Sequence, residues 1–117
     1  MAECVIVGQQ LEVRLSTKEK LEAVHGDVSV PLASVRTVEV VENALDFIHG
    51  LRVGTGIPGS TAIGTFSSSS ARLFAVIHHG KHGGVRIVLE HADFDEILLG
   101  CDDPAAVASA IPVTGGG

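Results

Sequence analysis

The sequence predicts a mainly β, α+β fold: an antiparallel barrel or sandwich with an early short helix and a C-terminal capping helix. Sixteen valines against four phenylalanines, with no tryptophan or tyrosine, indicate a core of small β-branched side chains, which suit strands. Short apolar segments recur between glycine, proline and serine turns. The length of 117 residues matches one domain, so we expect a single β domain over residues 1–111 and a flexible tail over 112–117.

The N-terminal part is expected to form a strand followed by a short helix. Residues 3–15 include an alternation of apolar and polar side chains, the pattern of a half-buried strand. Ser16 and Glu19 have the spacing of a capping box, in which each side chain satisfies a free backbone N–H at a helix start. The helix is expected to reach about Val24, and Gly26 is placed to end it in the left-handed conformation.

Further strands are predicted where β-type residues are bounded by turn residues. They cover 28–30, 35–41, 49–53, 61–66, 72–78, 85–89 and 95–100. The strand at 72–78 is apolar on both faces, which predicts that both faces are covered. Glycine-rich residues 80–84 predict a hairpin turn that pairs this strand with 85–89.

The C-terminal helix has a clear start and stop. Asp103 can cap a helix and Pro104 suits the first helical position, so the helix is expected over residues 104–110. Pro112 then stops it.

Four glycines and a proline between Arg52 and Phe66 predict a shaped loop over Gly54–Gly59. The loop matches G-x-G-x-x-G, but a dinucleotide site needs a helix directly after it, and residues 61–66 are strand-like. We interpret the segment mainly as a turn whose backbone passes close to another strand. The alternative is a loop that contacts a ligand or partner. The candidate binding residues are Arg52, Gly54, Gly56, Pro58 and Gly59.

Histidines near residue 80 form the only cluster with metal-ligand chemistry. His78 and His79 are adjacent on a strand and should point to opposite faces, while His82 lies in a turn. We therefore expect no metal site, with His78 and His82 as weak candidates. No cofactor and no catalytic residue are predicted, because the acidic residues at 93–103 match no EF-hand loop and the serines lie in no G-x-S-x-G motif.

Charge and cysteine usage exclude several classes of partner. A net charge of −6 disfavours nucleic acid and anionic membranes. No apolar run approaches the roughly 18 residues that span a bilayer. The N-terminus lacks the pattern of a secretory signal, which favours a reduced, cytoplasmic setting. Cys4 and Cys101 are expected as buried thiols, although the two sulfurs could approach each other if the terminal strands pair.

Three segments resemble a known family. Residues 30–38, Val-Pro-Leu-Ala-Ser-Val-Arg-Thr-Val, resemble the apolar-Pro-Leu-x-x-Ile/Val-x-x-Val pattern of bacterial pleckstrin-homology-like (PH-like) domains. Residues 50–59 and the closing Asp-Asp-Pro helix are similar to small actinobacterial members of that group. The resemblance covers roughly residues 11–111 and implies a bent antiparallel barrel plugged by its last helix. The basic cluster that grips inositol phosphates is missing and a helix is inserted at 16–25, so phosphoinositide binding is not implied.

Together these observations predict a non-enzymatic interaction module that binds another protein or self-associates. Exposed strand edges and apolar patches would be its contact surfaces. The alternative is a small-molecule- or metal-dependent enzyme, or a ligand-binding domain, that uses the Gly54–Gly59 loop with Arg52 and nearby histidines. Peripheral membrane association is a third possibility, which the net charge disfavours.

Overall fold

The computed structural model describes residues 2–113, so most of the predicted tail, residues 114–117, lies outside the described residues. A mainly β fold is confirmed. The strands are β1 (Glu3–Val7), β2 (Gln10–Arg14), β3 (Val28–Pro31), β4 (Val35–Val41), β5 (Leu51–Ile57), β6 (Thr61–Ser67), β7 (Arg72–Ile77), β8 (Gly84–Leu89) and β9 (Glu96–Gly100). The α-helices are α1 (Thr17–Ala23) and α2 (Pro104–Ala110), and the short 3-10 helices are η1 (Leu32–Ser34) and η2 (Ala44–Phe47).

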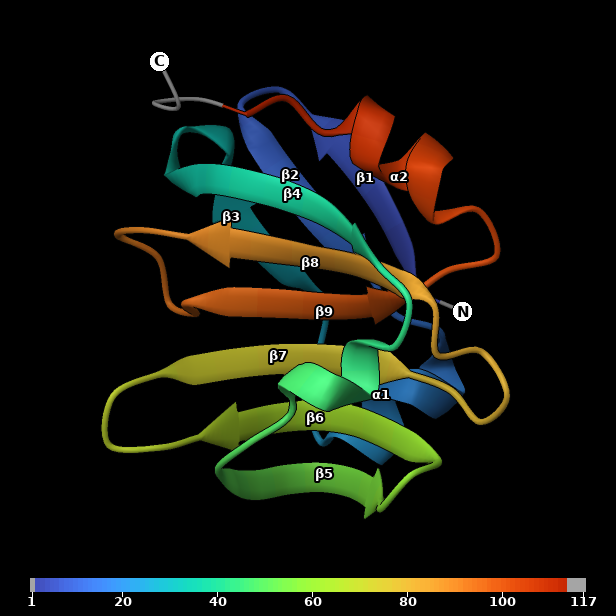
Figure 1. Ribbon diagram of the computed structural model, residues 1–117. Helices are drawn as coiled ribbons and strands as arrows, with labels where there is room; N and C mark the ends of the chain where they lie inside the picture. Colours follow the sequence, from blue (N-terminus) through green and yellow to red (C-terminus); the bar gives the residue numbers. More distant parts are fainter. Residues whose placement is uncertain (1, 114–117) are drawn as a thin grey trace.

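The strands form two sheets, neither of which closes into a barrel. The smaller sheet has the order β1-β2-β3, and the larger has the order β4-β8-β9-β7-β6-β5. In Figure 1 the smaller sheet lies behind the β4-β8-β9 half of the larger one, and α1 lies behind its other end. Of the two architectures expected from the sequence, the two-sheet arrangement is the one found.

The predicted hairpin across residues 80–84 is wrong. Strand β9 lies between β7 and β8, parallel to β7 and antiparallel to β8, so the large sheet is mixed rather than purely antiparallel. The glycines do reverse the chain locally, but β9 is buried on both faces from Ile97 to Gly100 and takes a central position. The apolar run of β9 is therefore buried in the middle of the sheet, as both faces of the sheet are covered there.

The large sheet is covered on both faces, as the sequence predicts for the strand at 72–78. Phe74 and Val76 of β7 face the small sheet and α1, whereas Leu73, Ala75 and Ile77 face η2. The main core also includes Leu11, Val13, Val30, Val35, Ile63, Val85, Ile87, Ile97 and Leu99. The second core, under η2, adds Ala44, Ala62, Phe66 and Leu98.

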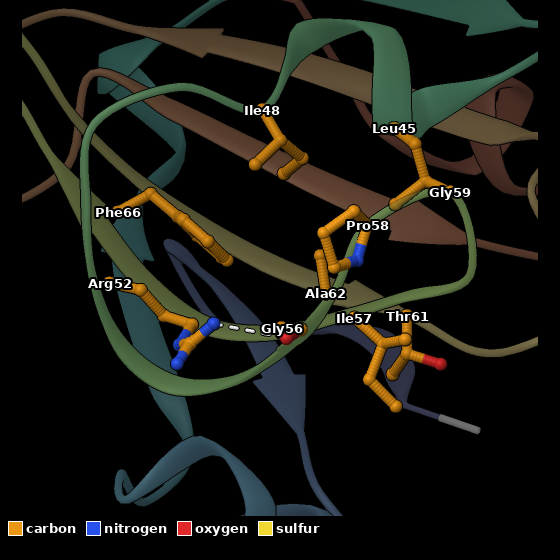
Figure 2. Close-up of a pocket in the computed structure, with 10 residues that line it drawn as sticks. All are labelled: Leu45, Ile48, Arg52, Gly56, Ile57, Pro58, Gly59, Thr61, Ala62 and Phe66. Atoms are coloured by element: carbon orange, nitrogen blue, oxygen red, sulfur yellow. Dashed lines mark hydrogen bonds between the residues drawn. The ribbon is translucent and has the colours of Figure 1, made fainter.

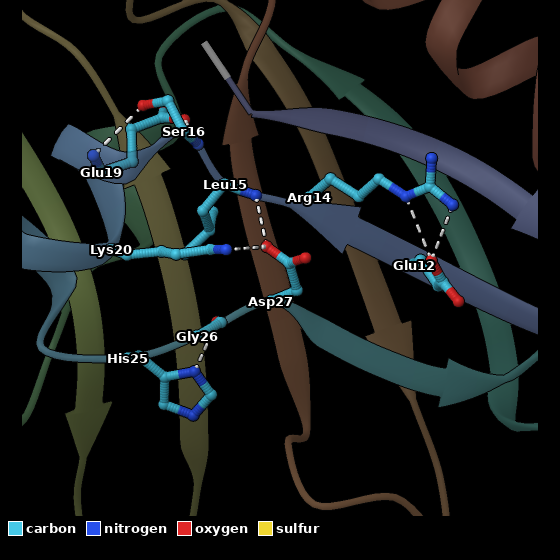
Figure 3. A network of polar contacts seen from close by, with 9 residues as sticks. All are labelled: Glu12, Arg14, Leu15, Ser16, Glu19, Lys20, His25, Gly26 and Asp27. Atoms are coloured by element: carbon cyan, nitrogen blue, oxygen red, sulfur yellow. Dashed lines mark hydrogen bonds and ion pairs between the residues drawn. The ribbon is translucent and has the colours of Figure 1, made fainter.

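Helix α1 begins at the predicted capping box. The Ser16 hydroxyl accepts the Glu19 N–H at 3.2 Å, and the Glu19 carboxylate accepts the Ser16 N–H at 2.9 Å (Figure 3). The predicted end at Gly26 is wrong, because Val24 takes the left-handed conformation with φ 54°. Asp27, just before β3, accepts the Leu15 N–H at 2.8 Å (Figure 3). This bond brings the start of β3 back to the end of β2, so the chain turns between α1 and Asp27.

Helix α2 also begins as predicted. The Asp103 carboxylate accepts the Ala106 N–H at 3.2 Å, and Pro104 occupies the first turn. The helix packs against β4 and β8, and Ile111, just after it, is buried in the main core. Over residues 2–113, no helix has both the length and the apolar character needed to cross a membrane.

The predicted loop over Gly54–Gly59 is mostly strand, because β5 continues to Ile57 before the chain turns. Gly54 lies opposite Gly64 of β6, and both have positive φ, at 131° and 144°. A Cβ on Gly54 would lie 2.9 Å from the Gly64 Cα, and one on Gly64 would lie 3.0 Å from the Gly54 Cα. Gly54 and Gly64 therefore allow two backbones to lie close together, as the main interpretation of the sequence pattern expects.

We predict that Gly64→Ala lowers the free energy of unfolding by about 3 kcal/mol, because the added Cβ both meets the backbone of β5 and is strained at positive φ. Urea denaturation measures the change. Gly26→Ala is the matched control, since a Cβ there has no atom within 4 Å, and it should change stability by no more than about 0.5 kcal/mol. Equal stabilities for the two variants would show that the glycine pair is not required.

Candidate functional site

Strand β5 is an open edge of the large sheet and carries exposed apolar side chains. Leu51, Val53 and Ile57 are 83%, 56% and 55% exposed. Alternate residues of a strand share a face, so Thr55 lies among them, and its hydroxyl donates to the Glu22 carbonyl of α1 at 3.0 Å. Helix α1 therefore packs on this face of β5 but leaves the three apolar side chains uncovered.

Helix α1 extends the exposed apolar surface. Leu21 and Val24, on either side of the residue that accepts the Thr55 hydrogen bond, are both exposed. We call these five residues the β5 patch: Leu21, Val24, Leu51, Val53 and Ile57. Exposed apolar residues are common singly, but a group of them beside an unpaired strand edge is typical of an interaction surface.

The opposite edge of the sheet, β4, carries more charge. Helix α2 packs against this strand, and the charged side chains of β4, Arg36 and Glu39, form ion pairs. Arg36 contacts Glu90 at 2.7 Å, and Glu39 contacts Arg86 at 2.6 Å. Strand β5 carries one charged residue, Arg52, and no proline, so it lacks most of the devices by which strand edges avoid pairing.

A hollow of about 300 Å³ lies next to η2, over the face of β5 and β6 that carries Arg52 and Gly56, and Ile57 at the end of β5 borders both this hollow and the β5 patch (Figure 2). Small residues of the strands form part of its lining, and larger apolar side chains surround it. The lining residues are Leu45, Ile48, Arg52, Gly56, Ile57, Pro58, Gly59, Thr61, Ala62 and Phe66. The hollow is therefore largely apolar, with one cationic group, Arg52.

Gly56 makes room for the Arg52 side chain. The Arg52 Nη1 donates to the Gly56 carbonyl at 3.0 Å (Figure 2). A Cβ on Gly56 would lie 2.7 Å from the Arg52 Cδ and 2.8 Å from its Nη1. Within residues 2–113, Arg52 forms no ion pair with a carboxylate. Its charge is therefore available to a ligand.

The structure brings four of the five candidate residues together. Arg52, Gly56, Pro58 and Gly59 line the hollow, whereas Gly54 does not and instead serves the close contact with β6. Sequence reasoning missed the apolar wall contributed by Leu45, Ile48 and Phe66. Leu45 and Ile48 come from η2 and the residue after it, a segment without helical or strand periodicity. A binding role for these residues remains a prediction.

The weak metal candidates do not converge. His78 Nε2 contacts the Glu19 Oε2 at 2.7 Å, whereas His82 Nε2 contacts the Ser60 carbonyl at 2.8 Å. His79 Nδ1 contacts the Ser60 hydroxyl at 2.7 Å, but no described residue bonds its other ring nitrogen, so this pair lacks the third group that orients a catalytic base. In the described part of the chain, no group of three or more His, Cys, Asp or Glu residues could hold a metal ion.

Glu19 is a buried carboxylate that ties α1 to the end of β7. Its side chain is 2% exposed and accepts from the Ser16 N–H and from His78. An ionised carboxylate only accepts, so His78 Nε2 carries the shared proton. Burial raises the pKa of Glu19, but the hydrogen bonds from His78 and Ser16 outweigh it and hold the pKa below its ordinary value.

The two cysteines are half-buried free thiols that line one hollow between β1 and α2. Burial, with a smaller contribution from Cys101, raises the pKa of Cys4 to about 12. Burial likewise raises the pKa of Cys101, and the nearby Asp102 charge adds to this effect. Both thiols therefore stay protonated at neutral pH, which disfavours a nucleophilic role.

Comparison with protein-family models, with curated proteins and with solved structures finds no match to this chain. The resemblance to PH-like domains therefore stays a prediction.

We predict that Glu19→Gln lowers the free energy of unfolding at neutral pH by about 2 kcal/mol, because it replaces a charged acceptor inside the fold. The pH dependence has a defined sign. Since the folded state lowers the pKa of Glu19 from about 4.5, its stabilisation is complete above that value and is lost as the pH falls through the lowered one.

Wild type should therefore lose more stability than the variant on acidification from about pH 6 to pH 3, measured by urea denaturation. Glu90→Gln, which removes a partner from an exposed ion pair with Arg36, is the control and should change the neutral-pH stability by less than about 1 kcal/mol. If the free energies of unfolding of wild type and Glu19→Gln changed equally with pH, the lowered pKa of Glu19 would be contradicted.

Proposed function

We propose that this protein is a non-enzymatic interaction module that self-associates through strand β5. The observation that carries the proposal is the contrast between the two edges of the large sheet. Strand β4 carries two charged residues, Arg36 and Glu39, each held in an ion pair, whereas β5 carries one charged residue, Arg52, and is flanked by the exposed β5 patch. An unpaired edge with apolar neighbours is a template for a further strand.

A second copy of this chain suits the β5 edge because the strand is self-complementary. Antiparallel pairing about a two-fold axis at Gly54 sets Leu51 against Ile57 and Arg52 against Gly56. Apolar side chains then meet apolar ones, and no like charges lie opposite each other. The Gly56 carbonyl accepts from Arg52 and has a second lone pair with which it can accept from a backbone N–H of the other copy.

The net charge of −6 opposes association of two copies at long range. Salt screens this repulsion but leaves the apolar contacts and backbone hydrogen bonds intact. Self-association is therefore stronger at physiological ionic strength than in dilute buffer. The same negative charge supports a proposal without a nucleic-acid partner and without membrane association. The cytoplasmic setting accompanies it as a proposal, with which two free thiols agree.

The PH-like resemblance is the fold hypothesis that accompanies this proposal. The segment Val30–Val38 covers the passage from β3 through η1 to β4, and α2 packs on the main core after the last strand. These features support a distant relationship to PH-like domains in an open, two-sheet form. Such scaffolds serve many interactions, so the choice of partner rests on the β5 edge rather than on the fold.

We predict that Val53→Lys weakens self-association by about tenfold or more, because it places a hydrated charge at the pairing edge. Sedimentation velocity across the micromolar range measures the dimer fraction. Val40→Lys is the matched control: Val40 is 54% exposed and lies on β4, the other edge of the same sheet. It should leave the dimer fraction unchanged. A strictly monomeric wild type, or equal effects of the two variants, would rule out pairing through β5.

A further inference from the structure

The guanidinium of Arg52 is the one cationic group of the hollow beside η2. Its Nη1 donates a hydrogen bond to the Gly56 carbonyl, while Nε and Nη2 have no partner among the described residues. Arg14, Arg36 and Arg86 each form an ion pair, whereas Arg52, like Arg72, has no carboxylate partner among the described residues. The hollow therefore combines apolar walls with an uncompensated positive charge.

We propose that this hollow binds a small organic acid that has one carboxylate and a short apolar body. The carboxylate pairs with the free edge of the Arg52 guanidinium. The apolar body lies against Leu45, Ile48 and Phe66, whose side chains surround the hollow in Figure 2. This site goes beyond the proposed self-association and does not depend on it.

The chemistry of the lining selects this class of ligand. A guanidinium presents paired N–H groups that match the two oxygens of a carboxylate. Among residues 2–113, Thr61 is the only hydroxyl of the lining and no lysine or second arginine lines the hollow, which leaves too few donors for a phosphate dianion. A cation would be repelled, and a neutral alcohol would leave Arg52 unpaired. The volume of about 300 Å³ limits the apolar body to a short one.

Gly56 is part of this site because it positions Arg52. It is not among the glycines with positive φ, so alanine suits its backbone. The Cβ of alanine would nevertheless come within 2.8 Å of the Arg52 Nη1 and displace the guanidinium. Gly56→Ala therefore changes the position of the charge while keeping both the charge and the backbone conformation.

A second arginine provides a matched comparison. Arg72 also lacks an ion pair among the described residues; its guanidinium lies 4.8 Å from the Phe94 ring centre and donates to the Asp93 carbonyl. The hollow next to it is lined by Asp27 and Asp93, whose negative charges oppose a carboxylate ligand. Arg72→Gln is therefore a control for the loss of a positive charge elsewhere on the same sheet.

The test is a titration of ¹⁵N-labelled protein with hexanoate, followed by the backbone amide NMR signals at constant ionic strength. We expect saturable shifts at the amides of Gly56, Gly59 and Ala62, and no saturable shifts with 1-hexanol. Arg52→Gln and Gly56→Ala should each weaken hexanoate binding by about tenfold, the loss expected for a charged hydrogen bond, whereas Arg72→Gln should leave it unchanged. The same titration in the Val53→Lys background separates ligand binding from self-association.

A blocked dipeptide that ends in leucine, with either a carboxylate or an amide at its C-terminus, distinguishes a peptide C-terminus from a small organic acid as the natural ligand. Tighter binding of the peptide acid than of hexanoate assigns a C-terminus as the natural source, and binding of hexanoate alone assigns a small acid. The proposal is overturned if hexanoate gives no saturable shift, if 1-hexanol binds equally well, or if Arg52→Gln binds hexanoate as tightly as wild type.

Discussion

The close approach of the β5 and β6 backbones at Gly54 and Gly64 is the constraint on which the open end of the large sheet depends. Two glycines with positive φ lie opposite each other where any Cβ would enter the partner strand. On one face, this leaves space for α1, whose Glu22 carbonyl accepts the Thr55 hydroxyl. On the other face, the hairpin presents Gly56 and Ala62 without large side chains, and the hollow forms there.

The two ends of the large sheet therefore have different properties. At the β4 end, α2 packs against the strand, the charged residues of the strand are ion-paired, and the core below it joins both sheets. At the β5 end, α1 is held by Thr55 and by the contact between Glu19 and His78, but the outer edge of the strand remains free. The buried Glu19 contact stabilises the helix on the sheet, so the same interactions that fix α1 also present its exposed Leu21 and Val24 beside β5.

The sequence allows the starts of the two α-helices to be predicted, because the signals of a helix start are local. The capping box at Ser16 and the Asp103–Pro104 helix start depend on hydrogen bonds within a few residues, and both are found. Strand order could not be predicted, because an apolar run such as Ile97–Leu99 indicates burial but not its neighbours. The same limit explains why the glycine-rich turn predicts a hairpin between two strands that β9 in fact separates.

The candidate site was predictable only in part. Arg52 and the nearby glycines are candidates because a charged residue beside flexible backbone is typical of a binding loop. Arg52, Gly56 and Gly59 do line one hollow. Gly56 leaves space for the Arg52 side chain. This role depends on where the Arg52 side chain lies, which a sequence pattern does not predict. The contribution of Ile48 follows from the way η2 folds over the sheet, and the exposed edge of β5 follows from the strand order.

The most direct test of the account is backbone amide hydrogen exchange, measured residue by residue at low and high protein concentration. The account predicts that the amides of β5 that point away from β6 exchange rapidly in dilute solution and become protected on concentration, while the amides of β4 that point away from β8 show no such change. Exchange at β5 that does not depend on concentration, or protection that appears at β4 instead, would contradict the claim that β5 is the open, pairing edge of this sheet.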